Sequence, residues 1–434
     1  MTDGAPPASP NPAGAVKQPT RPTLAEMLGP GLITGASDDD PSGIATYSQA
    51  GAQFGYDLGW VMLFSYPLMC VIQEISARIG RVTGRGIAGN LRLHYAKPVV
   101  FALVGLLLVA NTINLGADLG AMAAAVELVI GGPHLLYVAL FALLSVVLEV
   151  FVRYSRYVMV LKWLTLSLLA YVGVAFVVHI PWAHVAYRIV VPHPVWSAAY
   201  LTVIVAIFGT TISPYLFFWQ AGEEVEDVKE RAGARPLTRA PEQAAGEFQR
   251  IRWDTYIGMA VSNLVALFII LTTAATLNAH GVTDIQTSAQ AAEALRPIAG
   301  QLVFTVFALG IIGTGLLALP VLAGSAAYAV GEAVGAHVGL ARKPSRAKLF
   351  NGVIVAATLV GAVLNFTPLD PIKALFWTAV INGVVAVPIM AMIALLGSRT
   401  DVMGDFVLPR GLKTIGWVTT VVMAAAAAGM FATM

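Results

Sequence analysis

The hydrophobic positions of this chain come in long unbroken blocks, separated by short polar segments. Eleven blocks reach the length of about 20 apolar residues that a helix needs to cross a bilayer. The predicted spans are 28–54, 57–80, 98–130, 134–152, 157–179, 197–223, 252–277, 298–331, 349–366, 371–397 and 411–433. This pattern predicts an all-α integral membrane protein with eleven transmembrane helices.

The basic residues alternate in step with these spans. With the N-terminus placed inside, 23 of the 26 Lys and Arg residues fall in inner segments, and only Arg188, Arg296 and Lys373 lie outside. Cytoplasmic loops carry an excess of Lys and Arg, and one span more or fewer would destroy this separation. We therefore expect a multi-pass protein of the cell (inner) membrane with a cytoplasmic N-terminus and an external C-terminus.

The amino-acid composition also indicates an integral membrane protein. Of 434 residues, 57% are hydrophobic and 12% charged, and the mean hydropathy is +0.76. Soluble enzymes and nucleic-acid binders carry about twice that share of charge, and the net charge of +2 is too small for a polyanion-binding protein. Residues 1–26 are rich in Pro, Ala and Gly and predict a disordered cytoplasmic tail. We expect a monomer in the lipid bilayer, with no nucleic-acid partner and no cofactor.

The first span contains an unusual polar cluster. Asp38, Asp39 and Asp40 stand in mid-span, directly before Pro41. Because an ionised carboxylate is costly in hydrocarbon, such residues should face a cavity, a cation or a proton path. Pro41 disfavours a helical conformation at Asp40, so we expect the helix to unwind here and to expose carbonyl oxygens beside the carboxylates. Alternatively, the aspartates cap a broken helix or lie in an outer vestibule, an interpretation that applies best to Asp38 and Asp39.

A second break is predicted in the sixth span, where Thr210 and Ser213 precede Pro214. Spans 1 and 6 are five apart, and an odd offset inverts topology. We therefore expect an inverted repeat of spans 1–5 and 6–10, with discontinuous helices 1 and 6 and a substrate bound where the breaks meet. The transporter domain should cover 27–433, with repeat one at about 28–180, repeat two at about 197–397 and an extra helix at about 411–433. A proline kink without function is the alternative for span 6.

The third span adds Asn111, Asn114 and Asp118, which lie on one helical face. Such a face either joins two helices through hydrogen bonds or lines a hydrated path. In span 2, Glu74 and Arg78 are four residues apart, which favours a structural ion pair or a gate. In span 10, Asn382 could face the cavity or form hydrogen bonds in the core. The histidines have no metal-site spacing.

At these residues the chain resembles the NRAMP divalent-metal transporters. The resemblance rests on GPG at 29–31, on Asp40-Pro41, on AGAQFGYDLGW at 50–60 and on IQEISARIGRVTGRGIA at 72–88. It implies the amino-acid-transporter-like inverted-repeat fold, alternating access, and a metal bound between the breaks of spans 1 and 6. It covers nearly the whole membrane region, and the first two spans carry its most specific motifs.

The departures from the family pattern concern the metal site. The family typically has Asp-Pro-Gly-Asn in span 1, where this chain has Asp40-Pro41-Ser42-Gly43, and Met-Pro-His in span 6, where it has Ser213-Pro214-Tyr215. By resemblance, Asp40 is the charged ligand, Gly43 and Ser213 replace the asparagine and methionine ligands, and Thr210 offers its backbone carbonyl. We expect Gly43 to enlarge the cavity and leave space for water.

This substituted pattern is similar to that of the NRAMP-related magnesium transporters. Loss of the soft methionine ligand leaves oxygen ligands, which suit Mg²⁺ with retained waters. Tyr215 stands where the family has the histidine associated with proton coupling, and a phenol with a pKa of about 10 is a poor proton carrier at neutral pH. The resemblance thus implies uptake of partly hydrated Mg²⁺ and also Mn²⁺, without proton coupling. Weak coupling through Asp118 or Glu74 remains open.

Two other functions are compatible with such a chain. One is classical proton-coupled Mn²⁺/Fe²⁺ transport, and the other is sodium-coupled transport of an organic solute by the same fold. The missing methionine, asparagine and histidine argue against the first, and the three aspartates would repel a substrate carboxylate in the second. Nothing in the sequence supports an enzyme. The possible accessory cavity or gating residues are Asp38, Asp39, Ser42, Tyr215, Asp118, Asn111, Asn114, Asn382 and Glu74.

Overall fold

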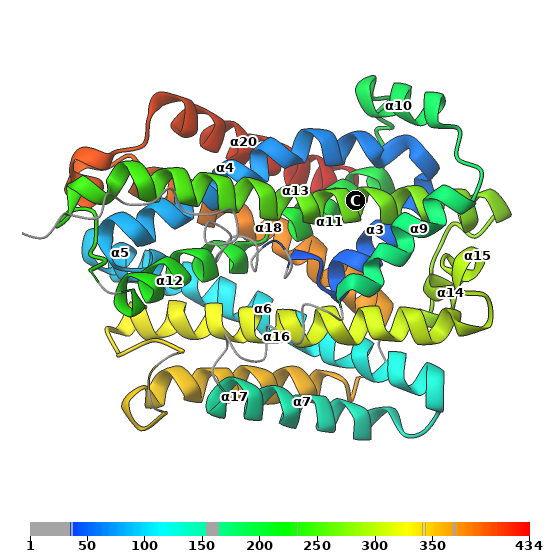
Figure 1. Ribbon diagram of the computed structural model, residues 1–434, viewed down its shortest axis with the longest axis horizontal. Coiled ribbons are helices and arrows are strands. Elements are labelled where there is room, and N and C mark those ends of the chain that lie inside the picture. Colours follow the sequence, from blue (N-terminus) through cyan, green and yellow to red (C-terminus); the bar gives the residue numbers. More distant parts are fainter. Residues whose placement is uncertain are drawn as a thin grey trace, which may run out of the picture.

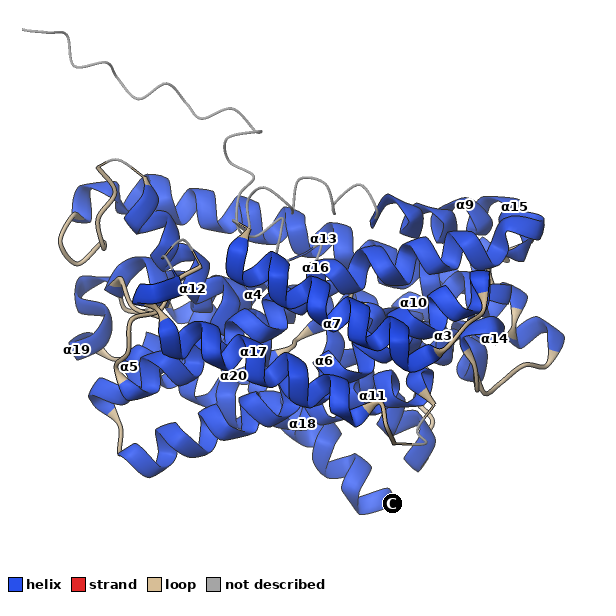
Figure 2. Ribbon diagram, turned by 90° about the horizontal axis from the view of Figure 1, so that it is seen from below, coloured by secondary structure: helices blue, strands red, loops and turns tan. Residues whose placement is uncertain are grey.

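The computed structural model describes residues 35, 38–152, 165–231, 233–340, 342, 344–367 and 370–434. Within these ranges every regular element is a helix (Figure 2), which confirms the all-α prediction. The predicted tail 1–26 and parts of spans 28–54 and 157–179 lie outside the described residues.

Most helices correspond to predicted spans, and shorter ones lie in the connections. The span helices are α3 (Pro41–Phe54), α4 (Gly59–Thr83), α6 (Lys97–Ile130), α7 (His134–Phe151), α9 (Leu169–Val177), α11 (Ala198–Thr211), α12 (Pro214–Glu230), α13 (Ala244–Thr276), α16 (Val303–Val334), α17 (Lys348–Leu364), α18 (Pro371–Gly397) and α20 (Arg410–Thr433). The shorter α-helices are α5 (Ile87–His94), α10 (Trp182–Val190), α14 (Ser288–Glu293), α15 (Arg296–Ala299) and α19 (Thr400–Met403). The 3-10 turns are η1 (Gly55–Leu58), η2 (Thr165–Leu168), η3 (Pro241–Gln243), η4 (Asn278–His280), η5 (Gly300–Leu302), η6 (Pro344–Arg346) and η7 (Gly404–Phe406).

The helices account for all eleven predicted spans. Eight helical stretches of the described chain are long and apolar enough to cross a membrane, and the bent pair Leu166–Val177 and Trp182–Val190 makes nine. One of the eight, Pro41–Thr83, contains two predicted spans, and α17 is a shorter apolar helix at the predicted ninth span. Each predicted span therefore has a helix at its position.

The stretch Pro41–Thr83 turns back on itself. It has 43 residues, and a straight helix of that length would measure about 65 Å, roughly twice the hydrocarbon thickness. Gly55, with φ at 58°, ends α3, and the turn η1 then leads into α4. Figure 1 shows α4 running back along the bundle from this turn. A glycine tolerates this φ without steric cost.

The bundle has a central layer that holds the polar residues. Figure 1 shows α3, α11, α12 and α18 in the middle of the molecule, with α4, α13 and α20 on one side and α6 and α16 on the other. Helices α7 and α17 pack on each other and on α6, and they form the outermost layer on that side. The polar site described below is thus shielded from lipid by other helices.

Helices α11 and α18 approach each other through reciprocal glycines. A β-carbon added at Gly209 of α11 would collide with the carbonyl oxygen of Ala379, and one added at Gly383 of α18 would collide with the backbone of Val205. Small residues allow this backbone contact between membrane helices. The N-terminal half of broken span 6 is therefore closely joined to span 10.

Two basic residues predicted outside lie at the opposite end of the bundle from one predicted inside. Arg188 in α10 and Arg296 in α15 lie at the end of the molecule that also holds α14, whereas Arg92 in α5 lies at the opposite end (Figure 1). This is the separation expected from the positions of Lys and Arg in the sequence. We refer to the end with α10 as the outer end and to the end with α5 as the inner end. The orientation of the protein in a cell remains a prediction.

Candidate functional site

The break in span 1 lies at Asp39 and Asp40. Asp38 is helical, the next two residues are not, and α3 begins at Pro41. Asp40 is its N-cap, with extended backbone angles of φ −69° and ψ 171°. Its Oδ1 accepts hydrogen bonds from the backbone N–H of Gly43 at 2.8 Å and from the Ser42 hydroxyl at 2.6 Å. The break is therefore confirmed, and one carboxylate oxygen of Asp40 satisfies the start of the helix.

The break in span 6 lies between α11 and α12. Helix α11 ends at Thr211, and Ser213 is the N-cap of α12, with extended backbone angles of φ −77° and ψ 133°. The Ser213 hydroxyl donates a 2.6 Å hydrogen bond to the carbonyl oxygen of Gly209. Because α11 stops here, its last carbonyls, including that of Thr210, lack a following turn of helix and present partial negative charge.

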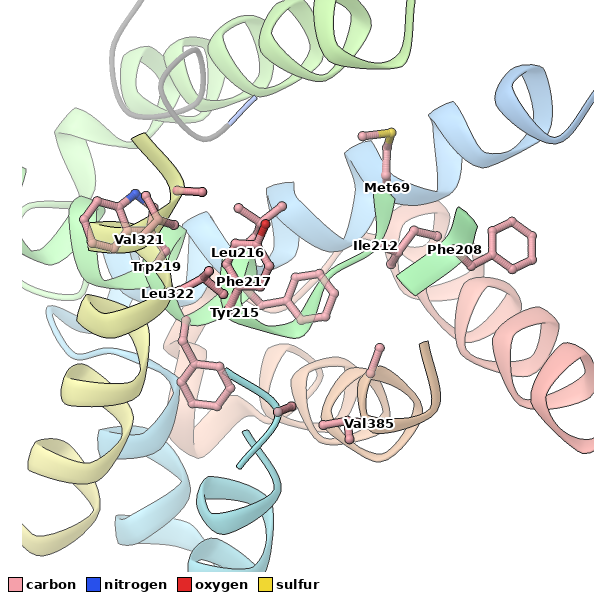
Figure 3. Close-up of a cluster of buried hydrophobic side chains, with 14 of the residues drawn as sticks. Met69, Phe208, Ile212, Tyr215, Leu216, Phe217, Trp219, Val321, Leu322 and Val385 are labelled. Carbon is pink, nitrogen blue, oxygen red and sulfur yellow. The ribbon is translucent and has the colours of Figure 1, made fainter. Parts of the chain in front are cut away.

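Apolar side chains enclose this second break. Figure 3 shows Phe208 and Ile212 before it and Tyr215, Leu216 and Phe217 after it, among side chains from neighbouring helices. All five are buried. The break is therefore held in place by packing.

Two hydrogen bonds join the breaks to each other. The Tyr215 hydroxyl of α12 donates to Oδ2 of Asp40 at 3.3 Å, and the Thr210 hydroxyl of α11 lies 3.0 Å from the Tyr47 hydroxyl of α3. The structure thus brings together Asp40, Tyr215 and Thr210, as the sequence predicts. The meeting point is almost completely buried, since Asp40 and Tyr215 are each 1% exposed.

The space expected beside Gly43 is not open. A β-carbon built on Gly43 would lie 3.2 Å from Cε2 of Tyr47 and 3.6 Å from Oδ1 of Asp40. The prediction that glycine enlarges the cavity for water is therefore wrong for this conformation, because the Tyr47 ring lies there. Tyr47 is four residues after Gly43 and thus on the same face of α3. Helical spacing could have identified it, and the sequence analysis missed it.

Helix α6 supplies a third wall, and its polar residues divide between two roles. The Asn114 amide donates to Oδ2 of Asp40 at 3.1 Å. The Asn111 amide instead donates to the Leu322 carbonyl at 2.9 Å and to the Ser325 hydroxyl at 2.8 Å on α16. Asn111 therefore joins two helices, whereas Asn114 belongs to the site.

Asp118 lies one turn further along α6. It is fully buried, within electrostatic range of Asp40, and both its carboxylate oxygens lack a hydrogen-bond partner among the described residues. In α18, Asn382 is also buried, and neither of its amide atoms has a partner in that part of the chain. The core hydrogen bonding considered for Asn382 is therefore absent from the described contacts. Unsatisfied polar groups at this depth are costly and are typical of places that take up an ion or water.

Asp38 and Asp39 face a different helix from Asp40. The Ser262 hydroxyl of α13 donates to Oδ2 of Asp38 at 2.6 Å and lies 3.2 Å from Oδ1 of Asp39. Both aspartates are buried, so they do not lie in an open vestibule. Ser262 has no distinctive sequence signal, because only the tertiary fold places α13 beside the break.

Glu74 and Arg78 form the ion pair expected from their spacing. Arg78 Nη2 lies 2.7 Å from Glu74 Oε1, and its guanidinium carbon lies 4.2 Å from the centroid of the Phe248 ring. The pair stays within α4 and contacts the inner part of α13. Its position supports a structural role.

A cavity of about 530 Å³ opens at the outer end. It is lined by residues of α3, α11, α18 and the 283–285 segment, among them Ala45, Gln49, Thr202 and Lys373. Gln49 spans its edge, since its amide donates to the Thr283 carbonyl and its oxygen accepts from the Ile285 N–H. Ala45 is two residues beyond Gly43, so the cavity reaches close to the break of span 1.

The inner end holds a group of paired charges that had not been predicted from the sequence. We call Arg81, Glu224, Asp227, Glu247 and Arg250 the inner ion cluster. Arg81 is fully buried, and its guanidinium lies 3.1 Å from Asp227 and 2.9 Å from Glu247. Arg250 lies 2.9 Å from Glu247 and also pairs with Glu224. These contacts connect α12 and α13 to each other and to α4, which is far from both of them in sequence.

Comparison with known proteins identifies the family of this chain. The family described as natural resistance-associated macrophage protein-like (Nramp) matches residues 31–433. Relatives include the divalent metal cation transporter MntH of Klebsiella pneumoniae (strain 342), which is 27% identical over 409 residues, or 92% of this chain and 91% of the relative.

Solved structures agree on the fold. A manganese transporter of Eremococcus coleocola, in complex with an aromatic bis-isothiourea substituted compound, matches 92% of this chain and 84% of its own, with a TM-score of 0.72 and 17% identity. Mhp1, a nucleobase-cation-symport-1 family transporter, matches 94% and 93% with a TM-score of 0.56 and 13% identity. These proteins are named as transporters and not as enzymes, as the sequence analysis expected for this chain. With the family match extending over most of its length, the chain belongs to the Nramp family of divalent metal transporters.

Proposed function

We propose that this protein takes up partly hydrated Mg²⁺, and also Mn²⁺, by alternating access and without proton coupling. The observation that carries the proposal is the set of groups around the two breaks. The described hydrogen-bond partners of Asp40 and Ser213 are oxygen or nitrogen atoms, and no sulfur is among them. Hard oxygen ligands suit Mg²⁺, and a thioether ligand would favour softer ions.

Oδ2 of Asp40 is the atom we assign to the ion. Oδ1 is held by the helix start, whereas among the described residues Oδ2 accepts only from the Asn114 amide and the Tyr215 hydroxyl. Both donors are side chains that can rotate. Rotation of the Asn114 amide would present its oxygen, which has no described partner, to an arriving cation. Ser213, the Thr210 carbonyl and the backbone at Gly43 would complete the site, and retained water would require the Tyr47 ring to move out of the space beside Gly43.

The two ends of the bundle support alternating access. The cavity at the outer end reaches the level of Ala45, while the inner ion cluster fixes α12 to α4 and α13. Entry from outside would be followed by release of this cluster and inward opening. The membrane potential would favour uptake by about 2.3 kcal/mol per elementary charge for each 100 mV.

Proton-coupled Mn²⁺ transport is the second candidate. It is favoured by the manganese transporter among the structural matches and by buried Asp118, a carboxylate without a described partner near Asp40. Against it stands Tyr215, since a phenol seldom ionises near neutral pH. The family match leaves sodium-coupled transport of an organic solute without support.

Uptake into proteoliposomes tests the proposal. The vesicles would contain a magnesium indicator or a pH indicator, under an imposed negative-inside potential. We expect Mg²⁺ entry without acidification. The Asp40→Asn variant serves as the control and should be inactive. Mn²⁺ entry with acidification and no magnesium signal would establish the second candidate instead.

A further inference from the structure

The inner end of the bundle contains a second cavity, remote from the breaks. It has a volume of about 350 Å³ and lies between α5, the end of α12 and the end of α16. We call it the inner basic pocket and define it by Arg85, Arg92, Leu93, Lys229, Glu332 and Arg342. The transport mechanism proposed above uses none of these residues.

Positive charge dominates this pocket. Arg85, Arg92 and Arg342 are exposed, and none has a carboxylate partner among the described residues. By contrast, Lys229 pairs with Glu226 at 3.0 Å. An array of guanidinium groups without counterions favours binding of an anion, and the planar guanidinium matches phosphate oxygens in pairs.

The one acidic residue that lines the pocket is already hydrogen-bonded to backbone groups. The Glu332 carboxylate accepts hydrogen bonds of 2.9 Å from the backbone N–H groups of Gly86 and Gly89, at the start of α5. A carboxylate at a helix N-terminus is stabilised by the helix dipole. Glu332 thus occupies the N-terminal end of α5, where an anion would otherwise bind. The arginines of the pocket remain available to another anion.

The pocket continues into an apolar, exposed edge. Leu93 lines it and is 52% exposed, and Val334 of α16, next to the pocket residue Gly335, is 51% exposed. A soluble anion would gain nothing from such an edge, whereas a lipid presents its phosphate and its acyl chain side by side. Basic pockets between helices on the cytoplasmic side are known to bind anionic lipid headgroups. From this juxtaposition we infer that the inner basic pocket binds the phosphate headgroup of an anionic phospholipid of the inner leaflet.

Arg92 also has a structural contact that the test must separate from lipid binding. Its guanidinium lies against the backbone of Gly335, the residue that ends α16 with φ at 80°. Cations stabilise a helix C-terminus, so Arg92→Gln could weaken the fold. Arg85 has no such described contact for its guanidinium. The single variant Arg85→Gln therefore reports on lipid binding with little risk to folding.

Native mass spectrometry of the purified full-length protein would test the inference. The protein would be equilibrated with equal amounts of phosphatidylglycerol and phosphatidylcholine. We expect the wild type to retain phosphatidylglycerol preferentially. Because each basic residue contributes about 1 kcal/mol to such binding, Arg85→Gln should weaken retention about fivefold and Arg85→Gln/Arg92→Gln about thirtyfold. The matched control is Arg410→Gln/Lys413→Gln, which removes two exposed charges at the start of α20, outside the pocket, and should retain the preference.

Thermal unfolding distinguishes the possible sources of the phosphate. Phosphatidylglycerol should raise the midpoint of wild-type unfolding, and inorganic phosphate at the same concentration should not. Equal lipid retention by the wild type and Arg85→Gln would overturn the inference. An equal rise in the midpoint with inorganic phosphate would also overturn it, because the pocket would then be a site for a free anion. Neither measurement depends on transport, so the inference stands or falls separately from the proposed function.

Discussion

The two helix breaks solve the same structural problem with different chemistry. In span 1, the N-cap is the carboxylate of Asp40, which receives four hydrogen bonds from Ser42, Gly43, Asn114 and Tyr215. In span 6, the N-cap is Ser213, a neutral residue whose hydroxyl donates back to the carbonyl of the preceding helix. The first break therefore concentrates negative charge, and the second presents only neutral oxygens.

This difference assigns separate tasks to the two breaks. A cation gains most from the charged break, so Asp40 should determine whether any ion binds. The neutral break surrounds the ion with weaker ligands, and a change there should alter which ion is preferred. Substitutions at each break, and at the side chains beside Asp40, test this division.

Asp40→Asn should abolish uptake, with a loss of roughly 100-fold or more, because removing one partner of a buried charged pair costs about 3–5 kcal/mol. Asparagine still caps a helix, so the fold should persist. Initial uptake rates in proteoliposomes measure the effect, with Asp401→Asn at the exposed inner end as the active control. Substantial transport by Asp40→Asn would show that the charged break does not determine whether an ion binds.

Ser213→Met should shift the preference from Mg²⁺ towards Mn²⁺ and Cd²⁺ by roughly tenfold, since a thioether binds softer ions better and tenfold corresponds to about 1.4 kcal/mol. Competition between Mg²⁺ and Cd²⁺ for uptake measures it. Ser213→Ala is the matched control, because it removes the hydroxyl without adding sulfur. If both variants changed selectivity equally, the effect would come from the lost hydroxyl and not from the sulfur.

Tyr215→Phe should lower the KM for Mg²⁺ by about fivefold. The lost hydroxyl donates to Oδ2 of Asp40 and must leave when the ion arrives, and a hydrogen bond of this kind is worth about 1 kcal/mol. The concentration dependence of uptake gives the KM, and Tyr137→Phe in α7 is the control. A higher KM in Tyr215→Phe would show that the hydroxyl belongs to the ion-bound state.

Asp38→Asn should reduce uptake only about twofold, because Asp38 is hydrogen-bonded to Ser262 and acts on the ion only through its charge at a distance. Ser262→Ala, which removes the hydrogen bond and keeps the charge, should have a smaller effect still. Uptake rates of the two variants, compared at equal expression, check this order. A loss as large as that of Asp40→Asn would make Asp38 a ligand.

The sequence was sufficient to predict the spans and both breaks, because each rests on a local signal. The length of apolar blocks predicts membrane helices, and Pro41 and Pro214 disfavour helix at the preceding residue. Asp40, Thr210 and Tyr215 could be assigned to one site because an inverted repeat brings the breaks together. The identity of the transported ion and the orientation in the membrane remain predictions.

Features that depend on tertiary contacts were not predictable in the same way. The pairing of Asp38 with Ser262 joins residues 224 positions apart, and the inner ion cluster joins three helices. The wrong prediction of a larger cavity at Gly43 has the same origin. Glycine in place of the family's asparagine removes a side chain, but the size of the cavity depends on the Tyr47 ring beside it. A single sequence indicates which groups are present, and only packing decides what fills the space between them.

The reciprocal glycines of α11 and α18 have a practical consequence for trapping the protein in one state. Because Gly209 and Gly383 leave no room for a methyl group between the two backbones, alanine at either position would act as a wedge. A wedge there would separate span 10 from the outer half of span 6 without touching Asp40 or the inner ion cluster. Such a variant would bias the balance between outward-facing and inward-facing molecules, and so provide a tool for capturing one half of the transport cycle.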